Sequence, residues 1–86
     1  MKFKNLMNNF NLIIISLKEI LFDGLAVFVS VPGLEGELTV LKNHIPLITL
    51  LKTGQIKVKV DGKEQIFNIQ KGLLEVNFAR TTILIS

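Results

Sequence analysis

Residues 33–54 read GLEGELTVLKNHIPLITLLKTG and decide the fold of this chain. Apolar residues gather at 38–41 and again at 48–51, and each run is too short and too rich in branched side chains to favour a helix. Glycines border both runs, and polar or turn-forming residues separate them at 42–46. The stretch therefore predicts two short strands joined by a tight corner.

The corner contains the only histidine of the chain, His44. Asn43 belongs to the residue type that, glycine apart, most readily adopts a positive φ, and Pro46 restricts Ile45 to an extended conformation. We therefore expect a rigid turn that holds its residues in one arrangement.

Before the corner, residues 10–16 contain a β-branched run that predicts a buried strand. A short strand is expected at 20–22, closed by a turn at Asp23-Gly24. Residues 25–31 alternate with a period of two, which predicts a further strand.

Phe28 is the unusual member of that strand. The alternation places Phe28 on the face opposite Val27, Val29 and Val31, where a solvated sheet normally carries a polar residue. Two interpretations remain open: a neighbouring loop or sheet edge covers Phe28, or it forms an apolar spot for a partner subunit.

After the corner, residues 55–60 alternate without error and end at Asp61-Gly62, a strong hairpin signal that favours a two-residue type I′ turn. The resulting register pairs Val60 with Lys63, Lys59 with Glu64, and Ile56 with Phe67. It also places Gln65 on the apolar side beside Val58, which indicates that a bulge or a longer loop is an alternative to the simple turn.

Further strands are expected at 73–77 and 82–86, which brings the total to eight to ten short strands with no amphipathic helix. This pattern is typical of an all-β, antiparallel sandwich or flattened barrel. Residues 1–9 show no clear period and are expected to form a flexible lead-in, followed by one sandwich domain at 10–86.

Composition limits the function classes. Of the 86 residues, 49% are hydrophobic and 20% are charged, which is enough apolar surface for one core. There is no cysteine, so disulfides and thiolate metal sites are excluded. The net charge of +3 is spread along the chain, and Trp and Tyr are absent, which argues against nucleic acid as a partner. No apolar span approaches the ~18–20 residues of a membrane helix, and no secretory cleavage signal is found, so we expect a cytoplasmic protein.

Residues with catalytic chemistry are scarce. His44 has no second histidine or cysteine beside it, and Glu35 and Glu37 flank Gly36 in what reads as an exposed loop. The glycines form neither G-x-G-x-x-G nor a phosphate-binding loop. We therefore predict no catalytic residue, metal, cofactor or small-molecule substrate, and expect a binding surface instead.

Five separated segments resemble one known family, in the right order along the chain. The segments GLEGELTVL (33–41), HIPL (44–47) and LKTGQI (51–56) closely resemble the N-terminal domain of the ATP synthase epsilon subunit. In that family G-x-E-G-E-L-x-x-L leads to a P-G-H-x-P-L corner and an L-K-x-G turn. LFDG (21–24) resembles its early F-x-G turn, and GLLEV (72–76) resembles its G-x-L-E-V strand.

The chain departs from the family pattern in three places. Lys42-Asn43 replaces the Pro-Gly before the histidine, and Asn is a plausible substitute for a glycine with positive φ. Lys71-Gly72 replaces a doubled glycine. The family normally continues into a helical hairpin that inhibits ATP hydrolysis and, in some members, binds ATP; this C-terminal helical domain is expected to be absent, so neither role is carried over.

The resemblance implies a ten-stranded sandwich at the foot of the rotor's central stalk, between the gamma subunit and the c ring. By resemblance, Glu37 lies near the polar loops of the c ring and His44 near gamma, and Phe28 is a candidate for the gamma-facing patch. The expected function is that of a non-catalytic coupling subunit of a proton-translocating ATP synthase, peripheral on the cytoplasmic face of the bacterial inner membrane.

Two other classes remain as alternatives. A small basic β-barrel that binds nucleic acid would lose affinity steeply with salt. A hydrolase or sugar-binding sandwich would show a concave pocket with convergent polar groups.

Overall fold

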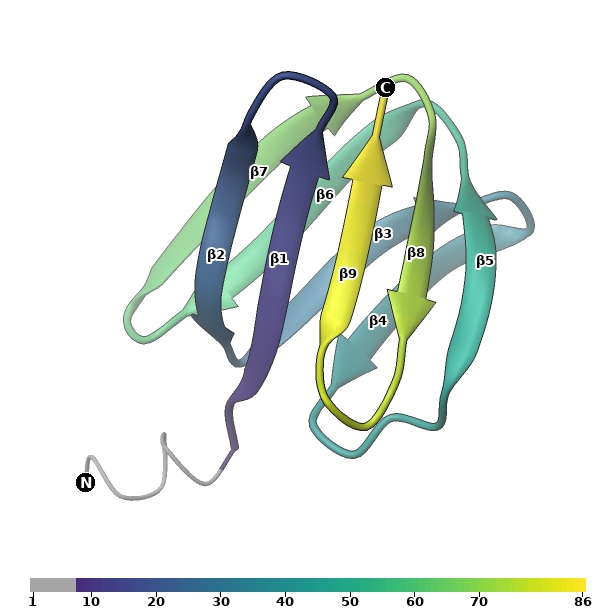
Figure 1. The fold of residues 1–86 in the computed structure, drawn as a ribbon. Helices are drawn as coiled ribbons and strands as arrows, with labels where there is room; N and C mark the ends of the chain where they lie inside the picture. Colours follow the sequence, from purple (N-terminus) through teal and green to yellow (C-terminus); the bar gives the residue numbers. More distant parts are fainter. Residues whose placement is uncertain (1–7) are drawn as a thin grey trace.

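The computed structural model describes residues 8–86 (Figure 1). These residues form nine β-strands joined by short connections and contain no helix. The strands are β1 (Phe10–Ser16), β2 (Ile20–Ala26), β3 (Phe28–Gly33), β4 (Gly36–Leu41), β5 (Leu47–Leu51), β6 (Gly54–Val60), β7 (Lys63–Ile69), β8 (Gly72–Val76) and β9 (Thr81–Ile85). The all-β prediction is confirmed. The lead-in predicted for residues 1–9 falls largely on residues 1–7, which lie outside the described residues.

The strands form one curled sheet that folds over itself into two layers. Figure 1 shows β2, β1, β9, β8 and β5 in the front layer, and β7, β6, β3 and β4 behind them. Hydrogen bonding follows the order β2-β1-β9-β8-β5-β3-β6-β7, with β4 paired to β3. The two layers are joined through β5 and β3, which pair at Gly33 and Leu51.

Two details of the predicted sandwich are corrected. Residues 8–86 form nine strands rather than the ten that the resemblance implied. The sheet is also not purely antiparallel, because β1 and β9 run parallel, with Ile14 opposite Ile83. Parallel neighbours need a long connection, and here almost the whole chain lies between them.

The core lies between the two layers. Each layer turns alternate side chains inward, as the period-two pattern predicted, and the inward residues are almost entirely aliphatic. The largest fully buried side chains are Leu12, Ile14, Val29, Val31, Val40, Ile56, Val58, Leu74 and Ile83. Ser30, which is also buried, shares a 2.9 Å hydrogen bond with the hydroxyl of Thr39 on β4, so its polar group is satisfied.

The hairpin of β6 and β7 has the predicted register. Val60 faces Lys63, Lys59 faces Glu64 and Ile56 faces Phe67, with no bulge where Gln65 meets Val58. Gly62 has a φ of 74°, but Asp61 is not among the residues with positive φ. A type I′ turn needs positive φ at both positions, so the predicted turn type was wrong.

The turn predicted at Asp23-Gly24 was also wrong. These residues lie inside β2, where Asp23 pairs with Ile13 and Gly24 with Leu12. The chain bends instead at Val27, which splits the expected strand at 25–31 into the end of β2 and the start of β3. At the bend, the N–H of Val27 donates to the carbonyl of Lys59, 2.7 Å away, so tertiary pairing replaces the local turn.

Candidate docking surfaces

The corner between β4 and β5 is held by its own backbone. Asn43 has a φ of 67°, the only positive φ among the non-glycine residues that the structure describes. The N–H of His44 donates to the carbonyl of Leu41 at 3.1 Å, and the His44 Nδ1 lies 2.8 Å from the carbonyl of Ile45. Asn43 therefore occupies the predicted left-handed conformation, and His44 is half-buried, with its ring held against the corner.

Substitutions of Asn43 test whether the corner needs a positive φ at this position. Asn43→Val should reduce the free energy of unfolding by about 1–2 kcal/mol, because a β-branched residue is strained at positive φ. Asn43→Gly should leave stability within about 0.5 kcal/mol of wild type. Urea denaturation followed by circular dichroism measures both; equal losses for the two variants would show that the positive φ is not needed in solution.

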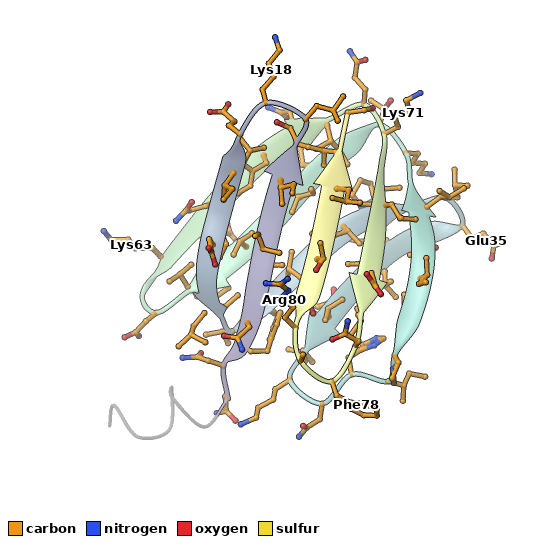
Figure 2. All side chains as sticks on the ribbon, in the orientation of Figure 1. Lys18, Glu35, Lys63, Lys71, Phe78 and Arg80 are labelled. Atoms are coloured by element: carbon orange, nitrogen blue, oxygen red, sulfur yellow. The ribbon has the colours of Figure 1, made fainter. Side chains whose placement is uncertain are left out.

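A second turn stands beside the corner, between β8 and β9. The side-chain Oδ1 of Asn77 accepts hydrogen bonds from the N–H groups of Ala79, at 2.8 Å, and Arg80, at 3.0 Å. This turn holds Phe78 94% exposed (Figure 2). A hollow of about 210 Å³ lies between the two turns, and both His44 and Phe78 line it. Sequence reasoning missed Phe78, although the asparagine before it is a typical turn signal.

Phe28 lies on the outer face of the back layer, opposite the buried Val29, as the alternation predicted. In the register it stands between Leu41 on β4 and Lys59 on β6. Its neighbours cover it in part, so it is half-buried, whereas Leu41 is exposed. Phe28, Leu41 and the corner of His44 thus adjoin one another at one end of β4.

The two glutamates lie at the other end of β4. Glu35 is in the turn between β3 and β4, and Glu37 is in β4 itself, opposite Pro32; both are exposed. The turn depends on Gly36, whose φ is 137°. A wide, shallow hollow of about 700 Å³ adjoins the glutamates and is otherwise lined mainly by apolar side chains from β3–β4, β5 and β8: Leu34, Leu38, Ile48, Leu50 and Leu73.

An apolar row crosses the outer face of the front layer, which sequence reasoning did not find. The register places five residues side by side on successive strands: Leu50 on β5, Leu73 on β8, Leu84 on β9, Ile15 on β1 and Ile20 on β2. Leu50 is 55% exposed, Leu84 44% and Ile20 60%. Contiguous exposed apolar side chains of this kind mark interaction surfaces. They are scattered in the sequence, so only the strand order reveals the row.

The candidate reactive side chains lie apart from one another in the described residues. Within residues 8–86 no three His, Asp or Glu side chains gather closely enough to hold a metal ion. His44 bonds to the backbone, and neither glutamate lies beside it: Glu35 and Glu37 line hollows at the opposite end of β4. The same residues contain no helix long and apolar enough to span a membrane. Exposed apolar side chains lie at both ends of β4 and across the front layer, which are therefore the candidate docking surfaces.

Comparison with known proteins gives a consistent result. The family model described as ATP synthase, Delta/Epsilon chain, beta-sandwich domain matches residues 9–86. The chain is 42% identical over 76 residues to the ATP synthase epsilon chain of Dichelobacter nodosus (strain VCS1703A), covering 87% of this chain and 53% of that protein. It is 38% identical over 79 residues to the ATP synthase epsilon chain of Delftia acidovorans (strain DSM 14801 / SPH-1), covering 91% and 57%. The chain therefore spans about half the length of these curated relatives.

Two solved structures share the fold. A chain in the cryo-EM structure of Euglena gracilis mitochondrial ATP synthase (OSCP/F1/c-ring) matches with a TM-score of 0.84 at 22% identity, over 90% of this chain and 50% of that one. A chain in the Tetrahymena thermophila mitochondrial ATP synthase structure (central stalk/c-ring) matches with a TM-score of 0.72 at 16% identity, over 87% and 61%. At these identities the likeness shows the fold alone.

Proposed function

Because the chain belongs to the family of ATP synthase delta/epsilon β-sandwich domains, we propose that it is a non-catalytic coupling element of the ATP synthase central stalk. In this role it contacts the gamma subunit on one side and the ring of c subunits on the other. The complex works at a membrane, and we place this subunit peripherally on the cytoplasmic face of the bacterial inner membrane. It acts without a cofactor or a small-molecule substrate of its own.

One observation supports this role above the others: the two surfaces that the family assigns to different partners are separated along a single strand. Glu37 is near the start of β4, whereas Leu41 ends it and the His44 corner follows. At about 3.3 Å per residue, Glu37 and Leu41 are roughly 13 Å apart. A coupling element needs two separated docking surfaces, so we assign the Glu37 end to the c ring and the patch of Phe28, Leu41 and His44 to gamma.

The fold suits the transmission of torque between these surfaces. β4 is hydrogen-bonded to β3 over its whole length, from Gly33–Gly36 to Phe28–Leu41, and packs Val40 into the core. A close-packed sandwich has low compressibility, and within the described residues no helix pair or long linker interrupts it. A force applied at one end of β4 therefore reaches the other end with little deformation.

Phe28→Asp should weaken binding to gamma by about tenfold, because it places a charge in a partly apolar contact. Co-purification of the tagged 86-residue chain with the gamma subunit of the same synthase measures the effect. Ile66→Asp is the matched control, since Ile66 is an exposed residue on the outer face of the edge strand β7.

Circular dichroism melting of both variants separates loss of binding from loss of folding. Unchanged co-purification for a folded Phe28→Asp variant would contradict the assignment of Phe28 to the gamma surface. No co-purification of the unmodified chain would contradict the proposed function itself.

A further inference from the structure

Three connections and the end of β9 meet at one end of the sandwich, which is at the top of Figure 1. They are the β1–β2 connection at 17–19, the β5–β6 connection at 52–53 and the β7–β8 connection at 70–71. Thr53 Oγ1 donates to the carbonyl of Gln70 at 2.9 Å, and the N–H of Ser86 donates to the carbonyl of Lys71 at 3.3 Å. These bonds link the β5–β6 connection and the end of β9 to the β7–β8 connection. The three connections and the end of β9 are here called the lysine end.

Leu17 protrudes from the lysine end and is 98% exposed. The turn beneath it is fixed by Ser16, whose Oγ accepts from the N–H groups of Lys18, at 3.2 Å, and Glu19, at 3.3 Å. The N–H of Ser16 in turn donates to the carbonyl of Glu19 at 2.9 Å. A turn with three such bonds loses little conformational entropy when Leu17 is buried against another body.

Next to Leu17 lies a shallow hollow of about 500 Å³ with an almost wholly apolar lining. Five more leucines contribute to it: Leu34, Leu50, Leu51, Leu73 and Leu84. Lys71 is the only charged residue of the lining. The hollow continues the apolar row of the front layer to the edge of the molecule. A broad surface of leucine side chains therefore lies next to the protruding side chain of Leu17.

Two lysines border this apolar surface: Lys71 lines the hollow, and Lys18 follows Leu17. The β5–β6 connection adds Lys52, which lines a separate hollow together with Glu37, and the β1–β2 connection carries one carboxylate, that of Glu19. Figure 2 shows Lys18 and Lys71 both extending outward from the lysine end. Lysine stems pack along apolar surface while the ammonium group reaches the polar layer, an arrangement suited to the boundary between acyl chains and phosphate headgroups.

We propose that the lysine end contacts the surface of a lipid bilayer that carries anionic phospholipid. Leu17 enters the boundary between headgroups and acyl chains, the neighbouring leucines lie against it, and Lys18 and Lys71 face the lipid phosphates. Apolar burial and attraction to anionic lipid together set the strength of such binding. The contact involves no other subunit, so it goes beyond the proposed function. Leu34, Leu50 and Leu73 also line the hollow beside Glu37 that is assigned to the c ring, whereas Leu17, Lys18 and Lys71 belong to the lysine end alone.

Single tryptophans provide the test, because the chain contains none of its own. Leu17→Trp reports on the lysine end, and Phe78→Trp reports on an equally exposed residue at the opposite end (Figure 2). With vesicles of phosphatidylcholine and phosphatidylglycerol, the emission of Leu17→Trp should shift to shorter wavelength while that of Phe78→Trp stays constant. Vesicles of phosphatidylcholine alone should cause a much smaller shift.

Three lysine variants and one variant of Leu17 complete the design. Adding Lys18→Gln to Leu17→Trp should lower the vesicle partition coefficient about fivefold, as should adding Lys71→Gln. Lys63→Gln, at the distant β6–β7 turn, is the matched control and should have little effect. In vesicle co-sedimentation of the tryptophan-free chain, Leu17→Asp should lose at least about tenfold in binding.

Several results would overturn the proposal. They are no spectral shift of Leu17→Trp with anionic vesicles, equal shifts for both tryptophan positions, or equal losses for Lys18→Gln and Lys63→Gln. A Leu17→Asp variant that loses binding to gamma but keeps its vesicle binding would show that a protein, and not lipid, occupies this end. Since the vesicle assay contains no other subunit, its failure leaves the gamma contact standing, and the reverse is equally true.

Discussion

Gly72→Ala is expected to destabilise the protein by about 3 kcal/mol, because an added Cβ meets a closer neighbour here than at any other glycine of the chain. A Cβ at Gly72 would stand 2.5 Å from the backbone carbonyl oxygen of Leu84 and 3.3 Å from the Cγ2 of Ile85. Gly72 pairs with Ile85 on one side and Leu51 on the other, so strands flank it on both edges. The carbonyl cannot move away without disturbing the pairing of β8 with β9.

Gly24→Ala is the matched control. A Cβ at Gly24 would meet nothing closer than the Phe22 ring at 3.7 Å, so a change within about 0.5 kcal/mol is expected. For a domain of this size the total stability is about 4–13 kcal/mol, and a loss of 3 kcal/mol lowers Tm by roughly 12–24 °C. Thermal and urea denaturation measure both variants. Equal stability of Gly72→Ala and wild type would mean that β8 and β9 are not this close in solution.

Ile83→Ala is expected to cost about 3–4 kcal/mol, the second large effect. Ile83 is fully buried in the core and lies opposite Ile14 on β1 and Leu74 on β8. Strands on both sides fix the backbone, so the cavity left by the missing atoms cannot collapse, and the cost includes both lost burial and lost contacts.

Leu84→Ala, one residue further along β9, is its control. Leu84 points to the outer face and is 44% exposed, so its truncation should cost less than about 1 kcal/mol. Chemical denaturation of the pair tests which face of β9 is inside. Equal costs, or a larger cost for Leu84→Ala, would contradict the register of β9 against its neighbours.

The parts of the fold that depend on local chemistry were predictable. The hairpin at Asp61-Gly62 has the expected register because alternation and turn length together fix which residues face one another. Asn43 has its predicted positive φ because few other residue types tolerate that conformation. The alternation around Phe28 likewise placed its side chain on the correct face.

The parts that depend on distant partners were not predictable. Asp23 and Gly24 form strand because β1 supplies hydrogen bonds to them, which no local signal shows. The parallel pair of β1 and β9 joins residues from the two ends of the described chain. The apolar row of Leu50, Leu73, Leu84, Ile15 and Ile20 exists only once five strands are placed in order. For the same reason the sequence indicated His44 as a docking residue but not Phe78, which joins it from another turn.

We expect the sandwich to dock to the gamma subunit. Isothermal titration calorimetry of the 86-residue chain with the gamma subunit of the same synthase, repeated at several temperatures, measures this docking. One-to-one binding with a negative heat-capacity change is expected, since apolar surface is buried. A folded chain that binds gamma neither in calorimetry nor in co-migration would contradict it.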